Sequence, residues 1–164
     1  MCTTPTMKLE NNIATYCNVP ETVDYTNFSK RMQKYIDFCF NEAYLHDGAA
    51  KSKIASLLVF RNKPIAIGYN SMKTHPMQAK FGKNPDAICI HAEIDCIRKA
   101  SFLLKSEDFK KATMIVMRAK RDGSWGLARP CISKNGQGCQ MAISVYQIGT
   151  VIYSTDYTGK VSYL

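Results

Sequence analysis

The sequence lacks several features that would place it outside the ordinary globular proteins. None of its apolar runs approaches the ~20 residues that a membrane-spanning helix needs. Its first residues, MCTTPTMKLENN, contain no basic stretch followed by an apolar one, so we expect neither a secretory leader nor a membrane partner. Repeats and low-complexity tracts are missing too. With 46% hydrophobic and 21% charged residues, the 164-residue chain is predicted to fold as one compact domain.

Acidic residues are scarce, and the resulting excess of positive charge is local. The chain has 22 Lys and Arg against 13 Asp and Glu, a formal charge of +9. Residues 51–86 hold seven basic side chains and one acid, and residues 113–138 hold five and one, whereas residues 1–27 are net −2. Such stretches attract phosphates, although a solvated basic surface has the same composition.

Cysteine is present but shows no disulfide pattern. The seven cysteines are odd in number, and their spacing is not that of a small secreted domain. We therefore expect a reducing compartment, the cytoplasm, where a few of these thiols serve as metal ligands and the rest pack as small apolar side chains.

The hydrophobic pattern predicts helices and strands that alternate along the chain, which is typical of an α/β sandwich of three layers around a mixed sheet. Residues 1–27 read as an irregular N-terminal extension, and 28–164 as the single domain. The predicted helices span 28–46, 91–104 and 139–147. The predicted strands span 54–60, 65–69, 113–117, 150–154 and 160–163. Residues 70–86 and 121–138 are long loops, of the kind that carries function.

Three residues form a candidate metal site. An imidazole and two thiolates, from His91, Cys131 and Cys139, make a tetrahedral zinc set that leaves one position open for water. His91 and Cys139 both fall at predicted helix starts, where the helix dipole favours thiolate. Glu93 can lean over the open position and move protons to and from bound water. A purely structural site would have a fourth ligand, and none stands at a suitable spacing.

The combination of H-x-E with a later Pro-Cys and a second Cys is the signature of zinc deaminases. Over residues 28–158 the sequence resembles the cytidine and deoxycytidylate deaminase superfamily, most closely its small phage-type members. The resemblance is carried by the segments GYNSMKTHP (68–76), HAEIDCI (91–97), KRDG (120–123), LARPC (127–131) and GCQMAI (138–143). It implies an α/β/α sandwich with a mixed five-stranded sheet, a homo-oligomer, and a cytoplasmic protein that a phage genome could encode.

The sequence departs from the family in the spacing of its two cysteines. Seven residues, ISKNGQG, separate Cys131 from Cys139, where the family usually has two. The insertion is polar and contains two glycines, so we expect it to bulge outward and leave both thiols at the metal. Deaminases of the riboflavin pathway resemble this chain in having a long gap. Replacement of one ligand by Cys96 or Cys89 is the alternative.

The resemblance implies hydrolytic deamination of a free nucleotide, with dCMP converted to dUMP and ammonia. One Zn2+ per chain would activate water, and Glu93 would be the catalytic proton carrier. Asn70 would hydrogen-bond the sugar, and the backbone at Ala92 would meet the base edge. A second zinc ion near His75 occurs in some relatives, but we expect His75 to make an ordinary hydrogen bond in a loop.

Basic residues of the two long loops are the candidates for phosphate binding. They are Lys73, Lys80, Arg118, Lys120, Arg121 and Arg129. Arg129 stands closest to a ligand in sequence. Trp125 either stacks on the substrate base or fills a gap in the core.

Three other functions remain open. A purine nucleotide deaminase would use the same metal site with a roomier pocket. A deaminase of tRNA or single strands would need an aromatic groove and length for flanking nucleotides. With one Trp and little spare length, the chain is not expected to bind nucleic acid stably. A zinc-stabilised binding module would hold metal without releasing ammonia.

Overall fold

The computed structural model describes residues 21–47, 52–84, 86 and 88–164. Its helices are α1 (Lys30–Leu45), α2 (Pro76–Phe81), α3 (Ala92–Ala100), α4 (Ser106–Phe109) and α5 (Cys139–Tyr146), with a 3-10 turn, η1, at Tyr25–Asn27. Its strands are β1 (Thr22–Asp24), β2 (Lys53–Phe60), β3 (Lys63–Tyr69), β4 (Thr113–Ala119), β5 (Trp125–Gly126), β6 (Thr150–Ser154) and β7 (Lys160–Tyr163). The predicted α/β alternation is confirmed.

The strands form one mixed sheet in the order β1-β7-β6-β4-β2-β3, with β5 paired to β4. The β4–β6 pair is parallel, and the other pairs are antiparallel. All five predicted strands are present, but the sheet has seven, because β1 and β5 were not predicted. These two strands have three and two residues. Strands that short carry no readable alternation of apolar and polar residues.

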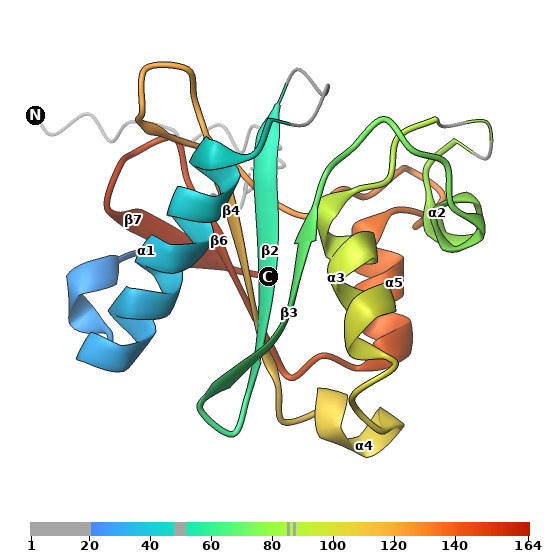
Figure 1. The fold of residues 1–164 in the computed structure, drawn as a ribbon, viewed down its shortest axis with the longest axis horizontal. Helices are drawn as coiled ribbons and strands as arrows, with labels where there is room; N and C mark the ends of the chain where they lie inside the picture. The colour runs from blue at the N-terminus through green and yellow to red at the C-terminus, as the bar shows by residue number, and fades with distance from the viewer. Residues whose placement is uncertain (1–20, 48–51, 85, 87) are drawn as a thin grey trace, which may run out of the picture.

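Helices cover both faces of the sheet, which gives the three predicted layers (Figure 1). On one face α1 buries Ile36, Cys39 and Ala43 against β2, β4 and β6. On the opposite face α3 and α5 build a second core that includes Ile94, Ile97 and the buried ring of Tyr153. Thus α1 buries one apolar stripe, as an amphipathic helix beside a sheet should, whereas α3 is buried on more than one side, its acidic residues Glu93 and Asp95 included.

The folded domain begins before the predicted boundary at residue 28. Thr22, Val23 and Asp24 pair with Ser162, Val161 and Lys160 of β7. The Lys160 Nζ and an Asp24 carboxylate oxygen are 3.1 Å apart. Residues 22–27 thus belong to the sheet and its η1 turn, while residues 1–20 of the predicted extension lie outside the described residues.

One glycine brings α3 against β3. A Cβ atom at Gly68 would lie 2.2 Å from both the Ala92 carbonyl oxygen and the Cys96 nitrogen. Only a residue without a side chain permits this approach. The start of α3, and with it His91, is therefore held beside the end of β3.

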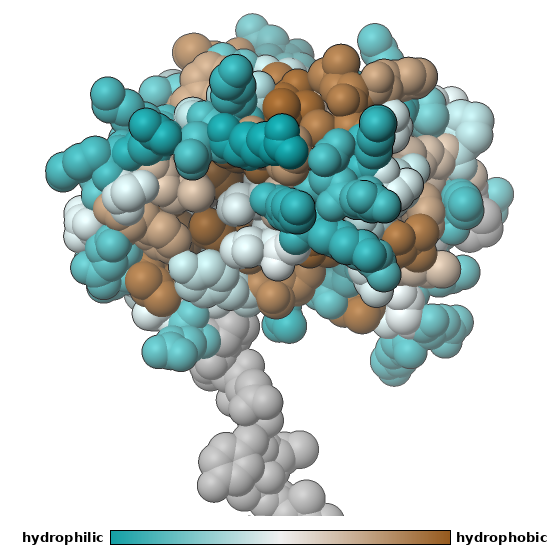
Figure 2. Space-filling view, turned by 90° about the horizontal axis from the view of Figure 1, so that it is seen from below, coloured by the Kyte–Doolittle hydropathy of each residue, from teal (hydrophilic) through white to brown (hydrophobic). Residues whose placement is uncertain are grey.

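One face of the molecule is mixed in hydropathy (Figure 2). Figure 2 shows hydrophilic side chains across much of the face seen from below, with hydrophobic ones gathered at separate places among them. Among the described helices, none combines the length and apolar character needed to cross a bilayer.

Candidate metal centre

The three predicted metal ligands meet at one point of the structure. His91 is the N-cap of α3, Cys131 lies in the loop after β5, and Cys139 is the first residue of α5. The His91 Nδ1 atom lies 3.3 Å from the Cys139 Sγ and 3.5 Å from the Cys131 Sγ. All three ligand atoms lie within 4.8 Å of one another. One nitrogen and two sulfurs at these separations suit a tetrahedral ion with Zn–N near ~2.0 Å and Zn–S near ~2.3 Å.

A buried glycine, Gly138, lets the backbone before Cys139 pack directly against Cys131, although seven residues separate the two cysteines. Gly138 has a φ of +133°, and a Cβ atom there would lie 2.4 Å from the Cys131 carbonyl oxygen. The Cys139 N–H points to the Cys131 Sγ at 3.3 Å, and the Gln140 N–H donates to the Cys131 carbonyl at 3.1 Å. The inserted residues 134–137 are exposed. The insertion therefore bulges outward as expected, and both thiols stay together.

The electrostatics of the site favour one thiolate even before a cation binds. Hydrogen bonding from the Cys139 thiol lowers the pKa of Cys131, and the His91 ring and the Cys139 backbone N–H act in the same direction. The same bond, together with burial, raises the pKa of Cys139. The bond from His91 to Cys131 raises the pKa of the imidazole. A bound zinc ion would compete with these protons for both sulfurs and the ring nitrogen.

Glu93 lies in the first turn of α3, two residues beyond His91, and is 5% exposed. Burial raises the pKa of its carboxyl group. A carboxyl of raised pKa beside a metal site suits general acid–base work near neutral pH. Glu93 is not part of the ligand group, which agrees with a role beside the ion.

A cavity of about 620 Å³ opens onto the ligands. It contains four of the predicted substrate-binding residues: Asn70, Ala92, Arg118 and Arg129. Its other lining residues include Ser52, Met72, Cys89 and Leu127. None of these four was predicted to line a substrate cavity, although Met72 and Leu127 lie in segments that carry the family resemblance and Cys89 was the alternative ligand. The packing of distant strands, which no local motif records, brings them to the cavity.

The Asn70 side chain is held by the start of β2. Its Oδ1 accepts from the Ile54 N–H at 2.9 Å, and its Nδ2 donates to the Ser52 carbonyl. The amide is thus fixed in orientation at the rim of the cavity, where its second Nδ2 hydrogen is available.

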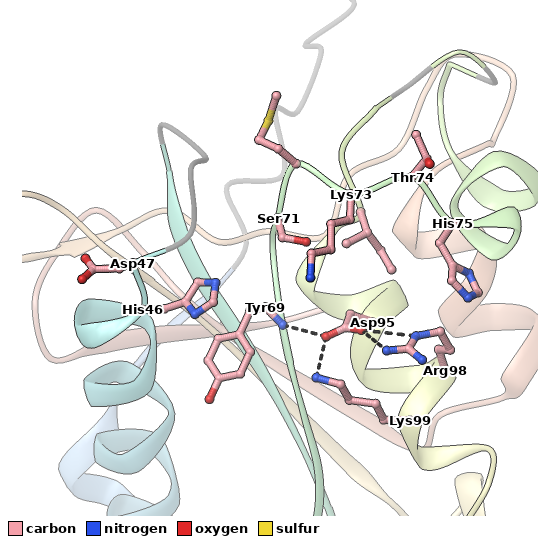
Figure 3. Close-up of a pocket in the computed structure, with 12 residues that line it drawn as sticks. His46, Asp47, Tyr69, Ser71, Lys73, Thr74, His75, Asp95, Arg98 and Lys99 are labelled. Carbon is pink, nitrogen blue, oxygen red and sulfur yellow. Dashed lines mark hydrogen bonds and ion pairs between the residues drawn. The ribbon is translucent and has the colours of Figure 1, made fainter.

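Lys73 lies outside the metal cavity. It lines a neighbouring cavity of about 810 Å³ between α1, β3 and α3 (Figure 3), which shares Met72 and Ile90 with the metal cavity. In this second cavity Asp95 bonds the Lys99 Nζ and an Arg98 Nη, each at 2.7 Å, and accepts the Tyr69 N–H at 3.1 Å. Lys80, on α2, is exposed with its Nζ over the Phe81 ring, and Arg121 is exposed.

Two further predicted substrate contacts are placed elsewhere. The Lys120 Nζ pairs with Asp156 at 3.2 Å, and Lys120 does not line the cavity. Trp125 is 5% exposed and packs beside α1, with ring centroids 5.4 Å from Tyr25 and 6.0 Å from Phe40. The structure therefore places Trp125 in the core on the face opposite α3. Of the two roles predicted for Trp125, the structure shows the filling of the core. Stacking on the substrate base is wrong, because the ring lies on the other face of the sheet from the metal ligand His91.

The alternative ligands are not at the metal site. Cys96 is buried with its Sγ on the Ala66 carbonyl, and burial raises its pKa to about 12. Cys89 lines the cavity, but its Sγ contacts the Met72 Sδ at 3.1 Å. His75 caps α2 by accepting the Met77 N–H at 3.1 Å. Within the described residues, His91, Cys131 and Cys139 are the single group able to hold a metal.

Comparison with known families agrees with this geometry. Residues 29–155 match the family described as the cytidine and deoxycytidylate deaminase zinc-binding region. The chain belongs to this family. Its site residues, an imidazole and two thiols with no fourth ligand in the part of the chain that the structure describes, fit one Zn2+.

Solved structures similar to this chain have low sequence identity, and the cyanophage structure among them supports the fold. The apo dCMP deaminase of cyanophage S-TIM5 is 14% identical, with a TM-score of 0.50 over 78% of this chain and 86% of that one. RibD of Acinetobacter baumannii is 18% identical, with a TM-score of 0.47 over 77% of this chain. This chain spans only 28% of that RibD chain. No curated protein sequence matches significantly.

Proposed function

We propose that this deaminase hydrolyses the exocyclic amino group of a free nucleotide, with dCMP as the substrate and dUMP and ammonia as the products. The observation that carries the proposal is the placement of buried Glu93 beside the His91, Cys131 and Cys139 cluster, at the base of a cavity with two arginines. Family membership supports the deaminase reaction, and the arginines support an anionic substrate.

In the proposed reaction the metal activates water and Glu93 transfers the protons. When bound, zinc supplies a Lewis acid that lowers the pKa of water toward ~7. The Glu93 carboxylate accepts the proton of the attacking water and passes it to the ring nitrogen beside the amino-bearing carbon. Glu93 then moves a second proton to the amino nitrogen, which leaves as ammonia. Its burial keeps competing water away from these transfers.

The cavity walls position the substrate. The Ala92 backbone lies beside Glu93 and faces the base edge, while Asn70 is fixed at the rim for a contact with the sugar. Arg118 and Arg129 are the candidates for the phosphate. Among the ion pairs of the described residues, neither arginine takes part. A guanidinium without a carboxylate partner is free to bind a phosphate through two parallel hydrogen bonds.

The insertion between the cysteines gives no support to a larger substrate. Residues 132–137 do not line the metal cavity. The segment between the cysteines therefore forms no wall of this cavity that would make room for a purine ring. Purine nucleotides and single-stranded nucleic acid are therefore included in the test as competing substrates.

The test is ammonia release by zinc-loaded protein from a panel of dCMP, deoxycytidine, AMP, dGMP and a cytosine-containing single strand. We expect dCMP to be used best and deoxycytidine poorly. The Cys139→Ala protein, which lacks one ligand, is the control for contaminating activity. Preference for a purine nucleotide or the single strand would replace the proposed substrate. Absence of ammonia from every compound would overturn the enzymatic function.

A further inference from the structure

The short helix α2 contacts both segments that carry metal ligands. It lies in the long connection between Asn70 and His91, beside α3 and α5 (Figure 1). The Gln78 Oε1 accepts the His91 backbone N–H at 2.8 Å. The Phe81 carbonyl accepts the Gly138 N–H at 2.7 Å, one residue before Cys139. One helix turn is thus bonded to the chain at two of the three ligands.

The hydrogen bond to Gln78 gives the His91 backbone N–H an acceptor that the His91 side chain does not provide. As the N-cap of α3, His91 has extended backbone, with φ −83° and ψ 150°, and its ring makes no cap bond because it faces the thiols. Its own N–H lies outside the helix and requires an acceptor. Gln78, 2% exposed, supplies that acceptor from inside the protein.

Gln78 is itself held firmly. His75 and Pro76 start α2, because the His75 Nδ1 accepts the Met77 N–H and Pro76 occupies the first turn. At the other end the Gly82 N–H donates to the Gln78 carbonyl at 2.6 Å. A Cβ atom at Gly82 would lie 2.5 Å from that same oxygen. The backbone that carries the Gln78 side chain is therefore held by bonds that involve no metal ligand.

We propose that Gln78 is a positioning residue of the metal centre. Its side-chain amide fixes the His91 backbone, so that the imidazole Nδ1 faces the sulfurs of Cys131 and Cys139. The proposal rests on the zinc site of the proposed function, but not on the identity of the substrate. Residues that orient metal ligands typically affect metal affinity by about 10- to 100-fold when changed.

Zinc affinity separates this role from a merely structural one. The variant Gln78→Met keeps the length of the side chain and removes the acceptor, while Gln78→Glu keeps an acceptor. Gln33→Met is the matched control, because the Gln33 Nε2 donates to the Thr26 and Phe28 carbonyls beside α1, on the other side of the sheet. Affinity is measured by competition with a chromophoric chelator, and the midpoint of urea unfolding with zinc and with EDTA.

We expect Gln78→Met to bind zinc about 10-fold more weakly than the unchanged protein. The zinc-induced rise in its unfolding midpoint should shrink as well, since a ligand stabilises the folded state by RT ln(1 + [L]/Kd), which falls as Kd rises. Gln78→Glu should recover most of the affinity, and Gln33→Met should lose stability equally with and without zinc. Unchanged zinc affinity in Gln78→Met, or an equal loss in Gln78→Met and Gln78→Glu, would overturn the proposal. Tight zinc binding without ammonia release would count against the proposed function alone.

Discussion

The two neighbouring cavities beside α3 hold charges in different ways. In the larger one, Asp95 pairs with Arg98 and Lys99 and accepts the backbone N–H of Tyr69 (Figure 3). Lys99 also donates to the Ile67 carbonyl at 2.8 Å. In the metal cavity, Arg118 and Arg129 have no carboxylate partner among the described residues.

This difference in charge pairing suggests different roles for the two cavities. In the larger cavity Asp95, Arg98 and Lys99 bind one another and the backbone of β3, the strand at the end of the sheet order among the described residues, whereas Lys73 has no ion pair there. Such bonds block pairing with another strand. In the metal cavity Arg118 and Arg129 are the candidates that we propose for binding the substrate phosphate. Cavity size alone would have pointed to the wrong one of the two.

Glu93→Gln should give the largest effect. The amide cannot carry a proton between water and the substrate, so we expect ammonia release to fall by about 10²- to 10⁴-fold. Zinc content, measured by atomic absorption, and the unfolding midpoint should stay close to those of the unchanged protein. A variant with unaltered turnover would contradict the assignment of Glu93.

Arg129→Ala and Lys73→Ala test whether the two cavities are distinct. We expect the first to raise KM for dCMP about 10- to 100-fold, as for loss of hydrogen bonds to a charged group, and to leave deoxycytidine unaffected. Lys73→Ala should change KM by less than about twofold, the range of an exposed charge. A similar rise in KM for dCMP in both variants would show that the two cavities act as one binding site. An equal loss for nucleoside and nucleotide would remove Arg129 from phosphate binding.

Asp95→Ala should act on stability and leave chemistry intact. The substitution leaves the Tyr69 N–H without its acceptor and frees Arg98 and Lys99. We expect a loss of about 1–3 kcal/mol in the free energy of unfolding, toward the lower end because both partners are about one-third exposed. Urea titration measures the loss, and kcat per folded molecule should be unchanged. A selective fall in kcat would give the larger cavity a part in the reaction.

Lowering the pH should weaken the ion pairs of Asp95 with Arg98 and Lys99, with a smaller effect on the free energy of unfolding than Asp95→Ala. Burial raises the pKa of Asp95, but bonds from Lys99 and Arg98 outweigh it and hold this pKa below its usual value. The stabilisation is therefore complete above the unfolded pKa of about 3.9 and is lost as pH falls through the lower folded value. Between pH 5 and 3, the unfolding free energy of Asp95→Asn should decline less steeply than that of the unchanged protein. Identical pH dependence would show that the ion pairs contribute nothing.

Local patterns were enough to predict the ligands. His91 and Cys139 were recognised from residue type and position at helix starts, and Cys131 from its Pro-Cys pair; the structure brings the three ligand atoms within 4.8 Å of one another. The five longer strands and the three principal helices were readable because apolar periodicity is a local property. Zinc itself followed from the donor set, since two thiolates and an imidazole leave few other ions.

Contacts between distant segments could not be predicted in this way. Trp125, in β5, and Arg129, in the loop after it, stand four residues apart, yet the first fills the core beside α1 and the second lines the metal cavity. Which of them faces the substrate depends on the pairing of β5 with β4, a two-residue strand with no sequence signal. Likewise α2 was predicted as loop, because a six-residue helix gives too short a pattern.

The sequence by itself determined the alternation of helices and strands, the identity of the metal ligands and the chemistry that such ligands support. The tertiary structure decided which basic residues reach the site, which charges are already paired, and that Gln78 supports His91 from 13 residues away. The reason is physical: periodicity and ligand type depend on neighbours along the chain, whereas cavities and buried hydrogen bonds depend on how remote strands pair and pack.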